Sequence, residues 1–222
     1  MTDAVVFDLD GLLLDTEQVW DEVRERLVRE RGGRWHDRAQ AYMMGMSSTE
    51  WSRYLHEELG LAEPPEELNR IVVERMEDRY RQQLPLVDGA AGAVRRLAGR
   101  WPLGLASSSN RPLIDLALDL MGVAELFRAT VSSEEVDRGK PAPDVYLEAA
   151  RRLGVKPENA VAVEDSAGGI RSAKAAGMGV VAIPNAHFPP ADEVLELADV
   201  RLESLAGLTP DAVQSASSRR GP

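Results

Sequence analysis

The chain has 222 residues, a net charge of −11 and a hydrophobic content of 44%, which suffices for one large core or for a core with an inserted domain. A chain this acidic is not expected to bind nucleic acid or an anionic membrane through its overall field, and any phosphate site in it needs local positive charge or a metal ion. Because it contains no cysteine, disulfides, thiolate catalysis and cysteine-ligated zinc are excluded.

The first strong pattern along the chain is a short apolar run, Ala4–Phe7, which predicts a buried strand. The sequence DLDG follows at residues 8–11, and Asp15 or Thr16 can then cap a helix. From residue 16 to residue 84 the apolar spacing is helical throughout. It predicts helices over residues 17–31, 39–44, 49–59 and 66–83, with a solvated face of interleaved Arg, Glu and Asp on the last of them.

After residue 84 short apolar runs alternate with helical patterns. Helices are predicted over residues 90–100, 112–121, 144–153 and 166–176, and strands over residues 103–106, 129–131, 160–163, 179–183 and 198–201. Residues 214–222 are expected to form a frayed tail. This alternation predicts an α/β protein with a doubly wound parallel sheet. Residues 1–15 and 85–222 would form the core, and residues 16–84 an inserted all-helical domain.

Polar side chains follow the predicted strands at the edge where open parallel sheets bind ligands. They are Asp8 and Asp10 after the first strand, Ser107, Ser108, Ser109 and Asn110 after the second, Lys140 in the loop after the third, and Glu164 and Asp165 after the fourth. Each has a plainer alternative as a turn, a helix cap or a surface cation. Their common position at one edge of the sheet favours a single site.

The chemistry of such a site follows from its groups. Converging carboxylates repel one another and need a cation, and all-oxygen ligands suit Mg²⁺. Hydroxyl and ammonium donors suit phosphate oxygens. A carboxylate such as Asp8 can attack phosphorus and form an aspartyl phosphate. A second carboxylate such as Asp10 can protonate the leaving oxygen.

Four sequence motifs resemble those of the haloacid dehalogenase superfamily, in its β-phosphoglucomutase-like branch with a helical cap. They are VVFDLDGLLLDTE at residues 5–17, LASSSN at residues 105–110, GKPAPD at residues 139–144 and VEDSAGGIRSAKAAG at residues 163–177. They stand in the family's order and spacing, so the resemblance covers nearly the whole chain. The resemblance implies a Rossmann-like core with a cap domain that closes over the site and selects the substrate.

The resemblance also implies a role for each core residue. Asp8 would be the nucleophile and a metal ligand, and Asp10 the general acid and then the base, with its backbone carbonyl on the metal. Ser107, with Ser108, Ser109 and Asn110 beside it, would bind the phosphoryl group, and Lys140 would neutralise Asp8 and the phosphoryl oxygens. Glu164 and Asp165 would hold Mg²⁺.

Departures from other family members narrow the activity. Asp10 argues against dehalogenation, because haloacid dehalogenases lack the second aspartate, and a cap without lysine excludes the Schiff base of phosphonatases. Sugar phosphomutases have a cap histidine where this chain has Trp20, and a phosphate-gripping arginine at the position of Ser48. Arg53 or an arginine on the long cap helix could replace that grip. Trp20 could pack in the core or line the cleft between cap and core.

These features predict a magnesium-dependent phosphatase that hydrolyses a small phosphorylated metabolite through an aspartyl phosphate. The alternatives are a sugar phosphomutase and, from another class, a non-catalytic binding module that keeps the fold. No nucleic acid or membrane partner is expected, and the protein is expected to be a monomer. No signal peptide is visible and no apolar run could span a bilayer, so a cytoplasmic location is expected by default.

Overall fold

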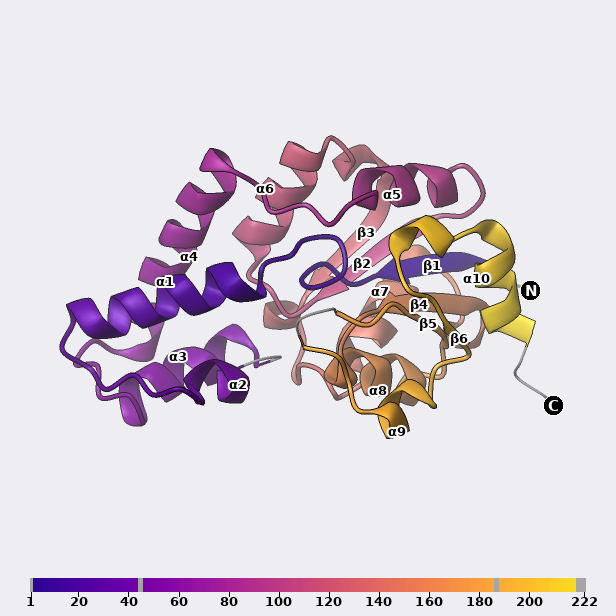
Figure 1. Ribbon diagram of the computed structural model, residues 1–222. Helices are drawn as coiled ribbons and strands as arrows, with labels where there is room; N and C mark the ends of the chain where they lie inside the picture. Colours follow the sequence, from indigo (N-terminus) through magenta and orange to yellow (C-terminus); the bar gives the residue numbers. More distant parts are fainter. Residues whose placement is uncertain (1, 44–45, 186–187, 219–222) are drawn as a thin grey trace.

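The computed structural model describes residues 2–43, 46–185 and 188–218. Its centre is a single sheet in which all strands are parallel (Figure 1). The six strands are β1 (Ala4–Phe7), β2 (Leu103–Ser107), β3 (Phe127–Ser132), β4 (Ala160–Glu164), β5 (Gly179–Ala182) and β6 (Val200–Arg201). Their order, β3-β2-β1-β4-β5-β6, runs outward from β1 in both directions. The doubly wound parallel sheet predicted from the sequence is therefore confirmed.

Helices cover both faces of this sheet. They are α5 (Ala90–Ala98), α6 (Arg111–Met121), α7 (Asp144–Leu153), α8 (Ala167–Ala175), α9 (Asp192–Leu195) and α10 (Pro210–Ser218). Because side chains alternate along a strand, Val5 and Phe7 of β1 pack with α5, α6 and α10, whereas Val6 packs with α7, α8 and α9. In Figure 1, α5 and α6 lie above the sheet, and α8 and α9 lie below it.

Four further helices lie beyond the carboxyl ends of the strands (Figure 1). They are α1 (Glu17–Glu30), α2 (Ala39–Met43), α3 (Ser48–Glu57) and α4 (Pro65–Gln82). Trp51 and Leu55 of α3 pack in one apolar core with Leu68 and Val72 of α4. In the described part of residues 16–84 every regular element is a helix, as the sequence predicts, although Met44, at the end of the predicted helix 39–44, lies outside the described residues.

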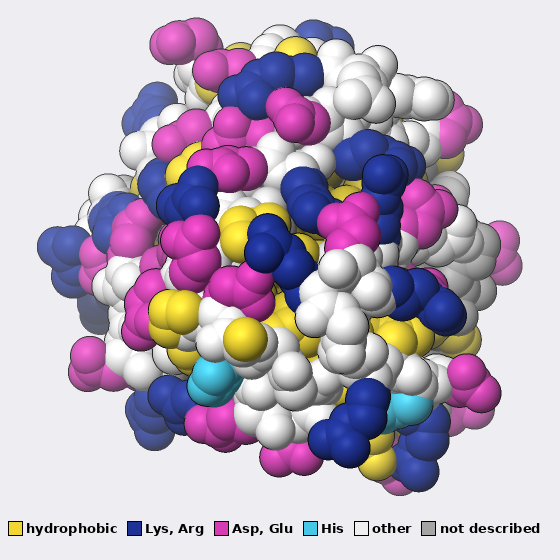
Figure 2. Space-filling view, turned by 90° about the vertical axis from the view of Figure 1, so that its left-hand side faces the viewer, with side chains coloured by type: hydrophobic (Ala, Val, Ile, Leu, Met, Phe, Trp, Pro, Cys, Tyr) yellow, Lys and Arg dark blue, Asp and Glu magenta, His cyan; other side chains and the backbone are white. Residues whose placement is uncertain are grey.

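The outer face of α4 is polar and charged. Arg70 pairs with Glu67 and Glu74, and Arg81 pairs with Glu77. Figure 2, which views the molecule from the side of the helical group, shows basic and acidic side chains interleaved over this surface. This agrees with the solvated face predicted from the alternation of charges, and such exposed pairs contribute little to stability.

The C-terminal prediction was wrong. Most of the stretch predicted to be a frayed tail belongs to α10, whose Val213 and Ala216 are fully buried against the sheet. The helix is short and rich in serine, so its own periodicity is weak, and burial of these two side chains stabilises it. Residues 219–222 lie outside the described residues. The helix α9 and the short 3₁₀ turns Ala124–Leu126, Ser133–Glu135, Pro157–Asn159 and Leu205–Gly207 were not predicted either.

The described helices are also informative about membranes. In the parts of the chain that the structure describes, none combines the length with the apolar composition that a bilayer span requires.

Candidate active site

The carboxyl ends of β1 and β4 bring Asp8 next to the loop that carries Lys140. The Lys140 Nζ donates to Asp8 Oδ1 at 2.7 Å and to Glu164 Oε1 at 2.6 Å. All three side chains are at most 8% exposed. Burial lowers the pKa of Lys140, but the two carboxylates outweigh burial and the net pKa is raised. The ammonium group therefore remains charged at neutral pH and bridges the two strand ends.

Glu164 is the most enclosed carboxylate of the site. Its Oε1 also accepts from the Tyr146 hydroxyl at 2.7 Å, and its Oε2 accepts from the backbone N–H of Asp165 and from Ser166. A Cβ on Gly169 would collide with this carboxylate, so only glycine lets the start of α8 approach so closely. Both oxygens of Glu164 thus have several donors, and they hold Lys140 in place.

Asp165 has one oxygen that lacks such donors. Its Oδ1 is buried and has no hydrogen-bond partner among the described residues. A Cβ on Gly11 would collide with its other oxygen, and Gly11 has a φ of 81° that favours glycine. Asp8, Glu164 and Asp165 each place one oxygen so that these atoms lie within 4.8 Å of one another. Such a cluster of hard oxygen atoms could bind a metal ion.

The pKa values of these carboxylates show why a cation fits. Burial raises the pKa of Asp8 to about 7, even though Lys140 lowers it, and Glu164 adds to the rise. Burial also raises the pKa of Asp165 well above its usual value, with Glu164 and Asp8 adding to the effect. One ammonium group therefore does not balance three buried carboxylates. A divalent cation beside the unpartnered oxygen of Asp165 would supply the missing positive charge.

Asp10 is held in a different way, by neutral donors. Its Oδ1 accepts from Thr16 Oγ1 at 2.7 Å and from the Trp20 indole at 3.4 Å. Its Oδ2 accepts from Ser109 Oγ at 2.7 Å and from Ser107 Oγ at 3.4 Å. Thr16 precedes α1, but its side chain does not cap that helix as the sequence had suggested, because the hydroxyl is bonded to Asp10.

Several of these groups line the floor of a cavity of about 580 Å³, a size that suits a small-molecule ligand. Of the residues predicted for the site, Asp8, Asp10, Ser108, Ser109, Lys140 and Asp165 line this cavity. Ser107, Asn110 and Glu164 are described but do not line it. The Ser107 Oγ also accepts from the Ser109 backbone, and the Asn110 amide donates to Asn69 and to Glu134. The structure therefore brings nine predicted residues to one region but exposes six of them to the cavity.

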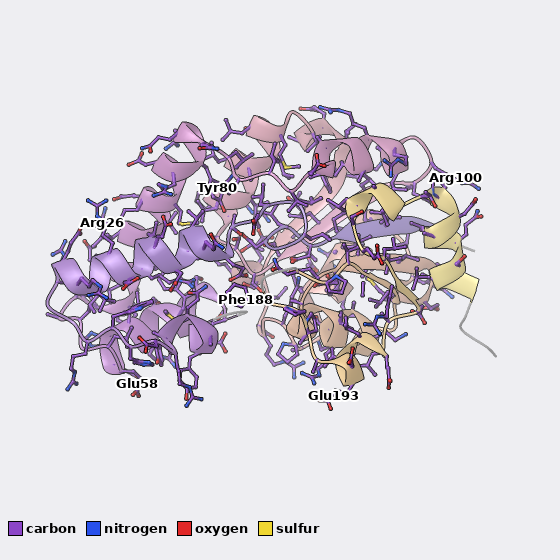
Figure 3. The ribbon with its side chains drawn as sticks, viewed as in Figure 1. Arg26, Glu58, Tyr80, Arg100, Phe188 and Glu193 are labelled. Carbon is purple, nitrogen blue, oxygen red and sulfur yellow. The ribbon has the colours of Figure 1, made fainter. Side chains whose placement is uncertain are left out.

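The opposite wall of the cavity comes from the helical group. Glu17, Trp20 and Arg24 of α1 line it, with Trp51 of α3 beside them. The loop after β5 supplies another part of the wall through Phe188, which Figure 3 places in the gap between the helical group and the sheet. Trp20 is buried and also lines the cavity, so it both packs in the core and lines the cleft.

Sequence reasoning missed several of these residues. Tyr146 and Arg24 carried no recognisable motif, since one is a helix tyrosine and the other belongs to the charged series of α1. Arg24 lies four residues after Trp20, so it shares the face of the helix that carries Trp20. That spacing was the only available signal. Neither Arg53 nor an arginine of α4 is among the residues that line the cavity.

Several known proteins are similar to this chain over most of its length. The profile of a family described as haloacid dehalogenase-like hydrolase matches residues 2–177. Hexitol phosphatase B of Escherichia coli is 33% identical in an alignment 225 positions long that covers 93% of this chain and 94% of that protein. A bifunctional riboflavin kinase/FMN phosphatase of Arabidopsis thaliana is 33% identical over 218 residues, or 95% of this chain and 57% of the plant protein.

A solved structure supports the same relationship. The crystal structure of CbbY from Rhodobacter sphaeroides in complex with phosphate superposes with a TM-score of 0.85 and 26% identity. The superposition covers 96% of this chain and 100% of that chain, so the similarity includes both the sheet and the helical group.

Proposed function

This chain belongs to the haloacid dehalogenase-like hydrolase family, and we propose that it is a magnesium-dependent phosphatase acting on small phosphate monoesters such as sugar phosphates. The observation that carries the proposal is the placement of Asp8 on the cavity floor. Its carboxylate is bonded to Lys140 at 2.7 Å and belongs to one oxygen cluster with Asp165 and Glu164, and Asp165 also has an oxygen, Oδ1, without a partner among the described residues. A buried nucleophile, a cation and a metal-binding oxygen thus surround one point.

The metal would be held by Asp8 and Asp165, with the backbone carbonyl of Asp10 as a further ligand. Glu164 belongs to the same oxygen cluster, but its oxygens already accept from Lys140, Tyr146 and Ser166, and we assign it mainly to positioning Lys140. When bound, Mg²⁺ would add positive charge beside the carboxylates and the phosphoryl oxygens.

In the first half-reaction a carboxylate oxygen of Asp8 attacks phosphorus and the bond from phosphorus to the ester oxygen breaks. The product is an aspartyl phosphate on Asp8 and a free alcohol. Lys140 offsets the negative charge on Asp8 and on the transferring group, and the hydroxyls of Ser108 and Ser109 line the same region. Positioned charges of this kind stabilise the transition state more than the ground state.

Asp10 moves the protons. It protonates the leaving ester oxygen in the first half-reaction and removes a proton from the attacking water in the second, which restores Asp8 and releases inorganic phosphate. Three of its four partners are the hydroxyls of Thr16, Ser107 and Ser109. Since a hydroxyl can donate or accept, these partners accommodate both the ionised and the protonated carboxyl group.

We further propose that residues 16–84 form a cap domain over a core made of residues 1–15 and 85–222. The cap would exclude water and select the substrate by the alcohol side of the ester. The names of the Escherichia coli and Arabidopsis thaliana relatives, a hexitol phosphatase and an FMN phosphatase, support a small phosphorylated metabolite. A cytoplasmic location and a monomeric state stay predictions.

A phosphomutase is the second candidate, and one observation favours it. A mutase needs a cation at the far end of the cavity to hold a second phosphate, and Arg24 lies in the cavity wall. The mutase histidine and arginine positions, however, hold Trp20 and Ser48. The Ser48 hydroxyl donates to Glu134 at 3.0 Å and is not among the residues that line the cavity.

The test is phosphate release from a panel of phosphorylated metabolites, with magnesium or with chelator, for the wild type and Asp8→Asn. Hexose 1-phosphates are included, and their isomerisation is followed in the same samples. We expect release that depends on the metal and disappears in Asp8→Asn, whose fold should persist because the change removes a buried charge.

Other outcomes have distinct meanings. Isomerisation without net release would identify a mutase. Turnover in excess chelator would refute the metal site, and turnover by Asp8→Asn would refute the nucleophile. A wild type that binds phosphorylated metabolites but never releases phosphate would favour the non-catalytic module.

A further inference from the structure

Arg24 is a buried cation that the phosphatase mechanism does not use. Its side chain projects from α1 into the cavity wall, and the residue is 5% exposed. Its Nε is buried without a hydrogen-bond partner, and it forms no ion pair with any carboxylate that the structure describes. Buried guanidinium groups are normally paired with carboxylate or carbonyl oxygens, which compensate for the loss of water. The described residues provide no such oxygen for the Nε of Arg24.

Two indole rings hold the guanidinium in place. The Arg24 Cζ lies 4.5 Å from the ring centroid of Trp20 and 4.8 Å from that of Trp51. The two rings are 6.1 Å apart and inclined at 55°. Contacts of this type offset part of the desolvation of a cation, but they supply no acceptor for the buried Nε–H of Arg24. Arg24 is therefore oriented for a ligand rather than satisfied by the protein.

The surroundings of Arg24 indicate what that ligand is. Burial lowers the pKa of Arg24 to about 10, against the opposing effects of Glu17, Asp10 and Asp21. The negative charges of Glu17, Asp10 and Asp21 thus act on this one cation, and the cavity lining adds Asp8 and Asp165. A second anionic group on the substrate would meet more negative than positive charge there. A neutral group with hydroxyls avoids this repulsion.

Glu17 adds a hydrogen-bond acceptor to the cavity wall that carries Arg24. It lines the same cavity wall about two helical turns before Arg24, and its Oε2 accepts from Gln40 Nε2 at 3.2 Å. The Gln40 Oε1 is buried and unpartnered among the described residues. An acceptor at Glu17 and donors at Arg24 match a group that both donates and accepts, which is the property of a hydroxyl.

We propose that Arg24 and Glu17 form a specificity subsite that binds hydroxyl groups on the uncharged, polyhydroxylated alcohol side of the substrate. This inference rests on the proposed phosphatase function and names its substrate class: monophosphates of polyols or sugars rather than bisphosphates or simple alkyl phosphates. A site that must hydrogen-bond a hydroxyl rejects an analogue without it, because its buried polar groups would then stay unpaired.

The experiment uses three esters with the same six-carbon chain: sorbitol 6-phosphate, n-hexyl phosphate and sorbitol 1,6-bisphosphate. The variants are Arg24→Met and Glu17→Gln, with Arg26→Met as the matched control, since Arg26 lies on the same helix with its side chain 77% exposed. We expect the wild type to prefer sorbitol 6-phosphate to both other esters by at least about tenfold in kcat/KM.

Arg24→Met should reduce kcat/KM for sorbitol 6-phosphate by at least about tenfold and change that for hexyl phosphate by less than about threefold. Its melting temperature should equal or exceed that of the wild type, because an unpaired buried charge is replaced by an apolar chain. A structural arginine would instead lower it. Arg26→Met should match the wild type throughout.

Binding of the same esters, followed by tryptophan fluorescence in the Asp8→Asn protein, separates the subsite from the activity. If the protein binds sorbitol 6-phosphate preferentially but the wild type hydrolyses none of the esters, the proposed phosphatase function is refuted and the proposed subsite is supported. Equal binding of hexyl and sorbitol phosphates, or an equal loss on both in Arg24→Met, would overturn the subsite. Preference for the bisphosphate that Arg24→Met abolishes would overturn it in favour of an anion grip.

Discussion

Lys140 is the single residue whose loss should disturb the site most. It is the cation that touches both Asp8 and Glu164, and all three side chains are buried. Removing one partner of a buried pair leaves an uncompensated charge, which typically costs about 3–5 kcal/mol. A solvent-exposed ion pair with the same geometry would contribute only about 0–1 kcal/mol to stability. Burial, not the contact distance, makes the difference.

We therefore expect Lys140→Met to lower the free energy of unfolding by about 3–5 kcal/mol in metal-free buffer and to abolish turnover. Urea unfolding followed by circular dichroism measures the first effect. The matched control is Arg138→Met, because Arg138 lies two residues away with its side chain 70% exposed and pairs with Asp144. Its loss should cost at most about 1 kcal/mol, and equal costs for the two variants would contradict the argument.

The residue scale also shows where motif reasoning reached its limit. The motifs marked Asp8, Asp10 and Lys140 as chemically active, because their types and their strand-end positions follow from the sequence. The partners of those residues did not follow from it. Thr16 and Ser109 reach Asp10, and Tyr146 reaches Glu164, through side-chain directions that only the folded chain sets.

Among the elements, a small polar junction joins the helical group to the sheet. Ser48 at the start of α3 donates to Glu134 Oε1 at 3.0 Å, and Asn110 donates to the same oxygen at 2.7 Å. The Asn110 amide also donates to Asn69 of α4 at 3.1 Å. The contacts of Asn110 place it between the two parts of the molecule, and substrate binding by Asn110 stays a prediction. We expect this junction to help hold the helical group over the cavity.

Ser48→Ala should therefore lower kcat/KM by about 2–10-fold, the equivalent of the roughly 0.5–1.5 kcal/mol of one hydrogen bond. Hydrogen exchange should accelerate at the start of α3 while the sheet stays protected. The control is Ser52→Ala, whose hydroxyl donates to Thr49 within the same helix. If both variants have the same kinetics and exchange, the junction does not position the helical group.

At the scale of the whole molecule, the net charge of −11 favours the binding of cations. Asp8, Glu164 and Asp165 form one buried cluster of carboxylates beside a single lysine, and the pKa of Asp8 is raised to about 7 by burial. A raised pKa means that the native state holds a proton that the unfolded chain has lost. The metal-free protein should consequently lose stability as the pH rises from about 4 to about 7.

Magnesium should reverse that loss. Magnesium at about 100 times its Kd should stabilise the native state by about 2.7 kcal/mol. The magnesium-induced rise in melting temperature should be larger at pH 8 than at pH 6, because a proton competes with the metal for Asp8 at pH 6. Thermal unfolding with magnesium and with chelator measures this. Asp165→Asn should show little shift, and an equal shift in that variant would place the cation elsewhere.

The sequence by itself determined the alternation of strands and helices up to β5, the helical character of residues 16–84 and the types of the reacting groups. These follow from local periodicity and from the rule that parallel strands present their carboxyl ends at one edge. Only the tertiary structure decided that the C-terminal residues form a packed helix, that Asn110 faces a junction and that Arg24 lies in the cavity wall with no ion pair among the described residues. Each depends on contacts between segments far apart in the chain, and local patterns carry no information about such contacts.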